Sequence, residues 1–171
     1  VTALEDDNVL AGPEAYSPSA NFVMRGNNTF FQTYETRYTD DIDRAEALKP
    51  SGIHYMDAGT SGGIWGLQVG YCLMVGGEKE PVKRLEPIFK TLAPENGWAH
   101  MGACGAGHYV KMVHNGIEYA MMQAYAEGYE LLEKKDIIKD VHGTFAAWQK
   151  GTVVRSWLLD LLVKALEEDP G

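Results

Sequence analysis

The feature that most constrains this chain is one uninterrupted helical stretch in its second half. Residues 107–135 contain no proline and are rich in alanine, methionine, glutamate and lysine, which are good helix formers. At 1.5 Å per residue such a helix is roughly 42 Å long, too long for a small surface helix. We therefore expect part of the 171-residue chain to be organised around one long central helix.

The first half of the chain has a different pattern, in which strands and helices alternate. Helices are expected over residues 40–48 and 81–92, and strands over residues 53–58, 71–75 and 98–101. Such alternation is typical of an α/β sheet. Residues 1–39 fit neither template and stay unassigned. After the long helix, periodic apolar residues predict two more helices, over residues 137–149 and 152–168.

These patterns divide the chain near residue 103 into an α/β part and an all-α part. We expect residues 1–103 to form one part of an α/β sheet domain, and residues 104–171 an all-helical domain. No Gly-x-Gly-x-x-Gly dinucleotide fingerprint occurs in the chain, and residues 102–107 have their glycines in the wrong order for it. The sheet domain is therefore expected to be partial, as in a fragment or a shortened protein.

Composition and charge exclude several classes of function. Fifteen basic against twenty-four acidic residues give a net charge of −9, which argues against binding to nucleic acid or to an anionic membrane. No apolar run reaches the roughly 20 residues of a bilayer span. The two cysteines, Cys72 and Cys104, have the spacing of neither a disulfide framework nor a zinc site. We expect a cytoplasmic protein without a metal.

Four polar residues of catalytic chemistry share one side of the long helix. Placed at 3.6 residues per turn, they are Lys111, His114, Asn115 and Glu118. An amine, an imidazole, an amide and a carboxylate together suit polyol or hydroxy-acid chemistry, in which a neutral lysine acts as general base and a carboxyl group returns a proton. The alternative is a solvated helix face that carries an ion pair between Lys111 and Glu118.

Two further positions are candidates for binding an anion. Loop residues 59–63 follow an expected strand at the edge where open α/β sheets bind ligands, although a plain turn would look the same. Arg155 is expected on an otherwise apolar helix, where a buried guanidinium is costly unless an anion or a carboxylate pairs with it. That partner could equally be Asp160 or Glu118.

Several long motifs resemble the decarboxylating 6-phosphogluconate dehydrogenases. The matching stretches are IHYMDAGTSGGIWG at 53–66, GYCLMVGG at 70–77, GAGHYVKMVHNGIEY at 105–119 and GTVVRSWLLDL at 151–161. The resemblance implies oxidation of 6-phosphogluconate by NADP or NAD, followed by loss of carbon dioxide to give ribulose 5-phosphate in the pentose phosphate pathway. It also implies that Lys111 is the base and that Glu118 is the acid that protonates the enediol.

The same resemblance implies that residues 1–103 are the C-terminal part of a Rossmann-like sheet domain, and that residues 104–171 are a helical domain for substrate binding and dimerisation that is truncated in this chain. It also implies a set of binding residues. His114 and Asn115 would hold the sugar hydroxyls and the reacting end of the cofactor. The remaining residues would bind the substrate carboxylate, the substrate phosphate and the cofactor: they are Ser61, Gly62 and Gly63 for the carboxylate, Tyr119 and Arg155 for the phosphate, and Asn28 for the cofactor.

Two other functions remain open at this point. A related 3-hydroxyacid dehydrogenase shares the Ser-Gly-Gly loop and a lysine on the long helix, but it needs neither an enediol acid nor a phosphate clamp. A non-catalytic remnant would keep only assembly or ligand binding. A homodimer is expected because the long helix has more apolar surface than a small bundle can cover, through Met112, Met121, Met122, Ala124 and Tyr125.

Overall fold

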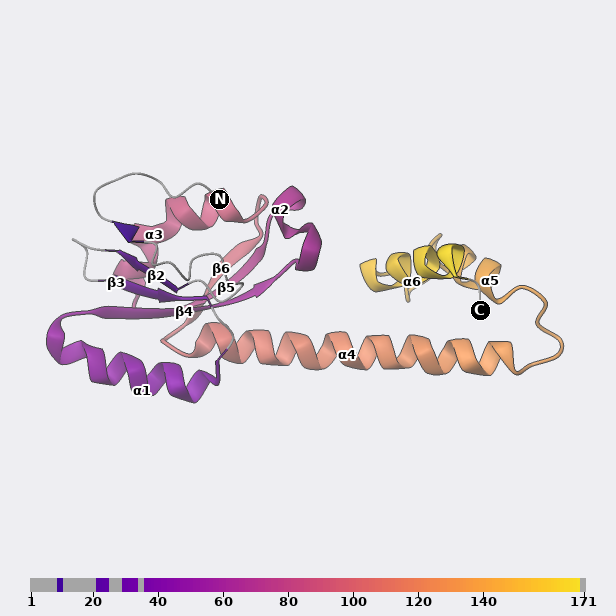
Figure 1. The fold of residues 1–171 in the computed structure, drawn as a ribbon, viewed down its shortest axis with the longest axis horizontal. Coiled ribbons are helices and arrows are strands. Elements are labelled where there is room, and N and C mark those ends of the chain that lie inside the picture. Colours follow the sequence, from indigo (N-terminus) through magenta and orange to yellow (C-terminus); the bar gives the residue numbers. More distant parts are fainter. Residues whose placement is uncertain (1–8, 11–20, 25–28, 34–35, 170–171) are drawn as a thin grey trace. The chain divides into compact units, whose positions relative to one another are not determined.

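A computed structural model describes residues 9–10, 21–24, 29–33 and 36–169 of the chain (Figure 1). The chain divides into two compact units, Val1–His114 and Asn115–Gly171. We refer to them as the sheet unit and the helical unit, and describe each by itself.

The sheet unit is built on one mixed sheet. Within the described residues it has six strands in sequential order, which are β1 (Val9–Leu10), β2 (Asn21–Met24), β3 (Thr29–Gln32), β4 (His54–Ser61), β5 (Cys72–Gly76) and β6 (Trp98–Gly102). The pairs β3/β4 and β5/β6 are parallel, and the other three pairs are antiparallel. The central strand β4 is buried over five consecutive residues, as expected for a strand covered on both faces.

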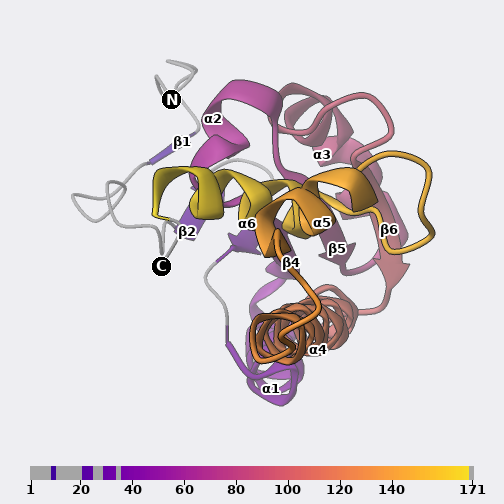
Figure 2. The same cartoon turned by 90° about the vertical axis from the view of Figure 1, so that its right-hand side faces the viewer.

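Helices cover both faces of this sheet. Helix α3 (Lys79–Leu92) lies on one face, and α1 (Tyr38–Leu48) lies on the other together with the first turns of α4 (Ala106–Glu133), as both views show (Figures 1 and 2). Helix α3 buries Val82, Leu85 and Phe89 against the sheet, at the helical spacing that the sequence shows. Short turns complete the unit, namely η1 (Lys49–Ser51), η2 (Gly63–Trp65) and α2 (Gly66–Val69).

The predicted elements of the sheet unit form within a few residues of their expected bounds, with two corrections. Strand β4 continues through Ser61, so most of the predicted loop 59–63 is strand, because Ala58, Gly59, Thr60 and Ser61 all pair with β5. Three strands also form within the unassigned residues 1–39. Their short segments lack the alternation of apolar and polar residues from which a strand is predicted.

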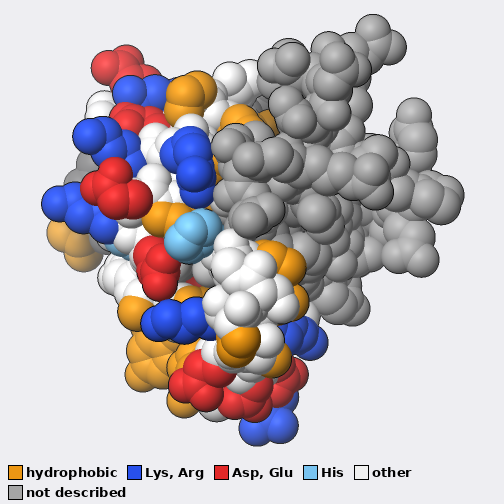
Figure 3. Space-filling model, turned by 90° about the vertical axis from the view of Figure 1, so that its left-hand side faces the viewer, with side chains coloured by type: hydrophobic (Ala, Val, Ile, Leu, Met, Phe, Trp, Pro, Cys, Tyr) orange, Lys and Arg blue, Asp and Glu red, His pale blue; other side chains and the backbone are white. Residues whose placement is uncertain are grey.

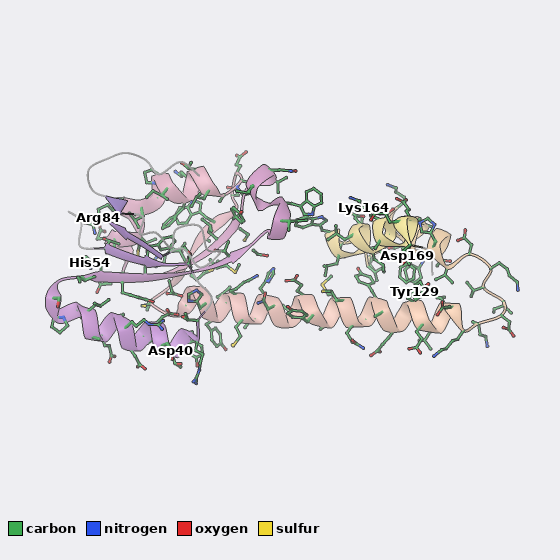
Figure 4. All side chains as sticks on the ribbon, in the orientation of Figure 1. Asp40, His54, Arg84, Tyr129, Lys164 and Asp169 are labelled. Atoms are coloured by element: carbon green, nitrogen blue, oxygen red, sulfur yellow. The ribbon has the colours of Figure 1, made fainter. Side chains whose placement is uncertain are left out.

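The helical unit packs three helices around an apolar centre. The second part of α4 contacts α5 (Val141–Trp148) and α6 (Trp157–Glu168) through a core of Phe145, Leu159 and Val163. Tyr129 points from α4 toward the other two helices (Figure 4) and lies 6.2 Å from Phe145 between ring centroids. The long helix predicted over residues 107–135 is confirmed.

The two later helices begin further along the chain than the sequence predicts. Asp140 caps α5 by accepting a hydrogen bond from the Gly143 N–H, and Ser156 caps α6 by accepting one from the Leu159 N–H. Residues of this type mark the position at which a helix begins. Val153 is fully exposed, and Arg155 is exposed in the turn before α6. The expectation of a buried arginine on a helix is therefore wrong.

The surface agrees with the charge balance of the sequence. On the part of the sheet unit that the structure describes, Figure 3 shows acidic and basic side chains interspersed on one face, with no patch of a single sign. Among the described residues, no helix is long and apolar enough to cross a bilayer.

Candidate active site

The sheet unit brings together three of the predicted site residues. Lys111, in the second turn of α4, is only 7 % exposed. Its Nζ lies 3.5 Å from Nδ1 of His114, and Nε2 of the same imidazole lies 3.4 Å from Oγ of Ser61 at the end of β4. If Nδ1 accepts a hydrogen bond from the amine, Nε2 carries the proton and donates to the serine. Amine, imidazole and hydroxyl thus form a chain of polar groups.

A glycine on β4 allows the lysine to lie this close to the sheet. A Cβ built on Gly59 would overlap the Cβ of Lys111 and would lie 2.8 Å from the carbonyl oxygen of Gly107. The first two turns of α4 therefore pack directly against the backbone of β4. This close packing buries the stem of Lys111, and any side chain at position 59 would displace it.

Beneath the lysine, a buried carboxylate caps the long helix. Asp57 on β4 is 0 % exposed, and it accepts hydrogen bonds from the backbone N–H groups of Gly105 at 2.6 Å and of His108 at 2.7 Å. Burial raises the pKa of this carboxyl group above its ordinary value of 3.8, and the two hydrogen bonds offset only part of that effect. The group is a cap that comes from a neighbouring strand.

A second buried carboxylate holds the side chain of His108. Oδ2 of Asp41, in the first turn of α1, lies 2.6 Å from Nδ1 of His108, which donates the hydrogen bond, and Oδ1 accepts from the hydroxyl groups of Tyr55 at 2.8 Å and Thr36 at 3.0 Å. Burial alone would raise the pKa of Asp41, but the hydrogen bonds from His108 and Tyr55 outweigh it and hold the pKa below 3.8. Burial and the adjacent Asp41 raise the pKa of Tyr55.

Asp41, Asp57 and His108 together have the composition of a metal site, since one ligand atom from each lies within 4.8 Å of the others. All four carboxylate oxygens, however, already accept hydrogen bonds from N–H or O–H groups of the protein. Hydrogen bonds within the protein thus satisfy both buried carboxylates, as buried polar groups require. The arrangement is that of a hydrogen-bonded network, and we assign no metal to it.

This network was not predicted, although one feature of the sequence indicates it. Asp57 is a charged residue within an apolar strand pattern, at a position that a central strand buries. A carboxylate there needs donors inside the protein. The buried role of Asp41 carried no such signal, because an acidic residue in the first turn of a helix is ordinary on a surface.

Of the other predicted site residues, Gly62 and Gly63 follow β4 in the sheet unit, where Gly62 precedes η2 and Gly63 begins it. The remaining ones belong to the helical unit or lie outside the described residues. Asn115 and Glu118 are partly buried on α4, and Tyr119 is 68 % exposed. Asn28 falls among the residues that the structure does not describe. The contact chain that the structure shows in the sheet unit joins Ser61, His114 and Lys111.

Arg155 lines an open hollow of about 370 Å³ in the helical unit. The hollow also contains the capped N-terminus of α6, and its other lining residues are Gln149, Lys150, Ser156, Trp157 and Asp160. Asp160 accepts a hydrogen bond of 2.9 Å from the side-chain amide of Gln149. Two cations beside a helix N-terminus suit an anion such as a phosphate.

Comparison with known proteins decides which family combines these features. Residues 20–105 match the family model for the NAD binding domain of 6-phosphogluconate dehydrogenase, and residues 107–170 match that for its C-terminal domain. The chain belongs to the 6-phosphogluconate dehydrogenase family. The predicted fold class, a Rossmann-like sheet domain followed by a helical domain with one long helix, is confirmed.

Relatives in this family match nearly the whole chain. The chain is 44% identical over 164 residues to the NAD(+)-dependent, decarboxylating 6-phosphogluconate dehydrogenase of Haloferax volcanii, covering 95% of this chain and 52% of the relative. It is 38% identical over 162 residues to the decarboxylating enzyme of Citrobacter amalonaticus, covering 91% of this chain and 35% of the relative. The chain thus spans about half or less of the curated relatives it matches.

Solved structures give the same picture. The 6-phosphogluconate dehydrogenase of Plasmodium falciparum, studied with NADP+ and with 6-phosphogluconate, matches with a TM-score of 0.74 at 28% identity, over 84% of this chain and 32% of that one. The 3-hydroxyisobutyrate dehydrogenase of Mycobacterium tuberculosis matches with a TM-score of 0.67 at 26% identity, over 79% of this chain and 45% of that one.

The described residues do not form a cradle for the pyrophosphate of a dinucleotide. The glycine-rich run that opens α4 is where N–H groups of a helix start could hold phosphate. Two of those groups, from Gly105 and His108, already donate to Asp57, and an anion placed there would meet this carboxylate. The start of α4 is thus closed to a phosphate.

Proposed function

We propose that this chain carries the substrate side of the oxidative decarboxylation of 6-phosphogluconate to ribulose 5-phosphate, with NADP or NAD as the cofactor. The observation that supports this most is the buried amine of Lys111 in contact with His114, whose ring also reaches Ser61. We retain the division near residue 103, with residues 1–103 as the partial nucleotide-binding domain and residues 104–171 as the substrate domain.

In this proposal Lys111 moves a proton twice. Its neutral amine takes the proton from the hydroxyl group on carbon 3 of the sugar acid, whose carbon-bound hydrogen would pass as a hydride to NADP or NAD. The resulting ammonium then donates to the new carbonyl oxygen while carbon dioxide leaves. Glu118 protonates carbon 1 of the enediol that remains, and the enol hydroxyl group releases its proton to solvent as the ketone forms. His114 and Asn115 hold the sugar hydroxyl groups, with the imidazole oriented by its contacts with Lys111 and Ser61.

The two charged ends of the substrate have separate partners. The carboxylate binds at Ser61, Gly62 and Gly63, where β4 ends and the backbone turns into η2. The phosphate binds Tyr119 and Arg155, and the hollow around Arg155 supports this role because Lys150 adds a second cation. Such local positive charge is needed in a chain whose net charge is −9.

Replacement of the base tests the reaction. Lys111→Ala should lower the turnover of 6-phosphogluconate by roughly 10²–10⁴-fold, the usual contribution of a general base, when reduced nicotinamide is followed by absorbance. Lys90→Ala is the control, because Lys90 is an exposed lysine of α3 that pairs with Glu86 at 2.7 Å. Near-normal turnover in Lys111→Ala would remove the assignment.

Binding of the phosphate can be tested separately by calorimetry on the 171-residue chain. Arg155→Ala should weaken the binding of 6-phosphogluconate by at least about tenfold, as expected when a charge-assisted contact is lost, and should leave the binding of gluconate unchanged. Equal binding of both ligands by the unmodified chain would contradict a phosphate site.

A 3-hydroxyacid dehydrogenase is the second candidate, favoured by the structural similarity to the enzyme from Mycobacterium tuberculosis. Its small substrate would use Lys111 and Ser61 but would leave Glu118 and Arg155 without a role. Turnover of 3-hydroxyisobutyrate that exceeds turnover of 6-phosphogluconate would select this function.

We further propose a cytoplasmic homodimer. Exposed apolar side chains on α4 support a partner surface, among them Met112 at 52 % and Met122 at 47 % exposure. Tyr125 does not contribute as expected, because it packs against the core of the helical unit and donates a hydrogen bond to the carbonyl group of Val154. A monomer in light scattering at micromolar concentration would contradict the dimer.

A further inference from the structure

The first turn of α4 lacks the local cap that a helix ordinarily has. The first N–H groups of a helix have no partner within the helix, and the side chain of the residue just before it usually accepts one of them. Here that residue is Gly105, which has no side chain and a φ of +89°. The turn is buried, since Gly107 and His108 are both buried, so water does not replace the missing cap.

Asp57 takes the place of this cap from 48 residues away in the sequence. Its two oxygens each accept one N–H group of the turn, and the negative charge lies at the positive end of the helix. Glycines surround it closely: a Cβ on Gly76 would overlap Oδ1 of Asp57, and a Cβ on Gly107 would lie 2.8 Å from Oδ2. The carboxylate therefore has room for one position only.

The side chain of His108 adds a second attachment to the same turn. Its Nδ1 donates to Asp41 on α1, while its Nε2 is buried without a hydrogen-bond partner in the described residues. The orientation of the ring is thus set by the bond to Asp41. Through Asp57 and Asp41, the turn is attached both to a central strand and to a neighbouring helix.

Lys111 lies three residues after His108, which is just under one turn further along the helix. The stem of the lysine rests against Gly59, two residues after Asp57 on the same strand. A shift or rotation of the first turn would therefore carry the amine away from His114 and Ser61. The attachments of the turn and the place of the amine are linked through short, rigid backbone.

We propose that Asp57, together with the Asp41–His108 pair, is a positioning residue that holds the amine of Lys111 in its buried place beside His114. The inference rests on the proposed function only in taking Lys111 as the reactive amine. It concerns where that amine lies, which can be measured without turnover.

The test is the rate at which acetic anhydride acetylates Lys111 in the 171-residue chain, followed by mass spectrometry over a range of pH. The exposed Lys90 and Lys134 serve as internal references. Asp57→Asn keeps the shape of the side chain but leaves one oxygen to accept two N–H groups. We expect acetylation of Lys111 relative to the references to rise roughly fivefold to tenfold, the factor by which loss of a cap bond releases a helix turn.

A pair of variants at position 108 separates positioning from general stability. His108→Leu removes the bond to Asp41 and should raise acetylation of Lys111 as Asp57→Asn does. His108→Asn places an amide N–H where Nδ1 lies and should restore the low rate. If Asp57→Asn does not fold, this pair decides alone, and equal rates in the two variants would overturn the proposal.

Asp140→Asn is the matched control, because Asp140 caps α5, a helix of the helical unit, with a hydrogen bond of the same length, 2.6 Å. It should leave acetylation of Lys111 unchanged. A rise as large as that in Asp57→Asn would mean general loosening and would overturn the proposal, as would an unchanged rate in a folded Asp57→Asn. Failure to bind 6-phosphogluconate would contradict the proposed function while leaving these rates, and this inference, intact.

Discussion

The two units bury different kinds of side chain. The helical unit has an apolar centre, in which Phe145, Leu159 and Val163 are the buried residues. The sheet unit also has an apolar cluster, but next to it lie four buried groups that can carry charge, which are Asp41, Asp57, His108 and Lys111. Apolar contacts are tolerant of direction, whereas hydrogen-bonded groups require one geometry. The difference indicates that the helical unit is built for stability and this part of the sheet unit for position.

The helices of the two units also differ in how their first turns are capped. Helices α5 and α6 are capped by the residue just before each of them, Asp140 and Ser156. Helix α4 is capped from a strand. The later helices can begin from local sequence alone, while the place of α4 depends on the finished sheet.

The largest expected effect comes from opening the apolar centre. Phe145 is 0 % exposed and contacts Tyr129 and Trp148. Phe145→Ala should lower the free energy of unfolding of the helical unit by about 3–5 kcal/mol, measured by hydrogen exchange of its peptides. Acetylation of Lys111 should stay at its original rate, because the attachments of the first turn of α4 are all in the sheet unit. Faster acetylation of Lys111 in Phe145→Ala would contradict this difference between the two units.

Smaller changes in unfolding free energy, of opposite sign, are expected from substituting two glycines with alanine. Gly59→Ala forces a methyl group into Lys111 and should cost about 1–3 kcal/mol of unfolding free energy through overpacking. Gly116→Ala, on α4, meets no atom within 4 Å and should stabilise by about 0.5–1 kcal/mol, because alanine favours helix. Urea unfolding checks both signs. A stabilising Gly59→Ala would show that the lysine does not rest on β4.

The pH dependence of stability should differ between the two buried carboxylates. The pKa of Asp57 is raised in the folded state, so its contribution is fully present below pH 3.8 and is lost as the pH rises through its folded pKa. The pKa of Asp41 is lowered, so its contribution is present above pH 3.8 and is lost as the pH falls through its folded pKa.

Urea unfolding at a series of pH values can separate these contributions. Asp57→Asn should remove the loss of stability on raising the pH from 3.8 toward neutral, and Asp41→Asn the loss on lowering it below 3.8. If both variants keep the pH profile of the original chain, the raised pKa of Asp57 and the lowered pKa of Asp41 do not contribute to stability.

The smallest effect concerns the two cysteines and leaves the fold unchanged. Burial, with a contribution from Asp57, raises the pKa of the Cys104 thiol to about 12, and Cys72 is exposed. Because the thiolate is the reactive form, iodoacetamide near pH 8 should alkylate Cys104 at least about a hundredfold more slowly than Cys72. Peptide mapping measures both rates. Similar rates would show that the loop before α4 opens.

The local sequence pattern predicted the helices and strands of this chain better than it predicted the tertiary contacts between them. The proline-free run gave α4, and the apolar stripe of Val82, Leu85 and Phe89 gave α3, because these signals repeat within the element itself. The helical spacing of the polar residues on α4 also predicted correctly that Lys111 and His114 lie close together.

The contacts that needed distant partners could not be predicted in this way. Pairing of β3 with β4, and of Asp57 with the start of α4, joins segments that local sequence does not connect. Arg155 was predicted to lie on a helix because the apolar pattern continues across Ser156. Serine is, however, a strong N-cap residue, and α6 begins directly after it. The contact of Asp57 and the start of α6 at Ser156 each depend on a single polar residue, which a periodic pattern does not reveal.

The strand origin of the cap has a consequence for synthesis on the ribosome. Asp57 is made 48 residues before Gly105, so the growing sheet holds a buried acid that has no donor until the glycine-rich turn emerges. The unit closes only when that turn arrives, since burying the acid before then is costly. The segment that carries the amine is thus the last piece of its own scaffold to be set in place.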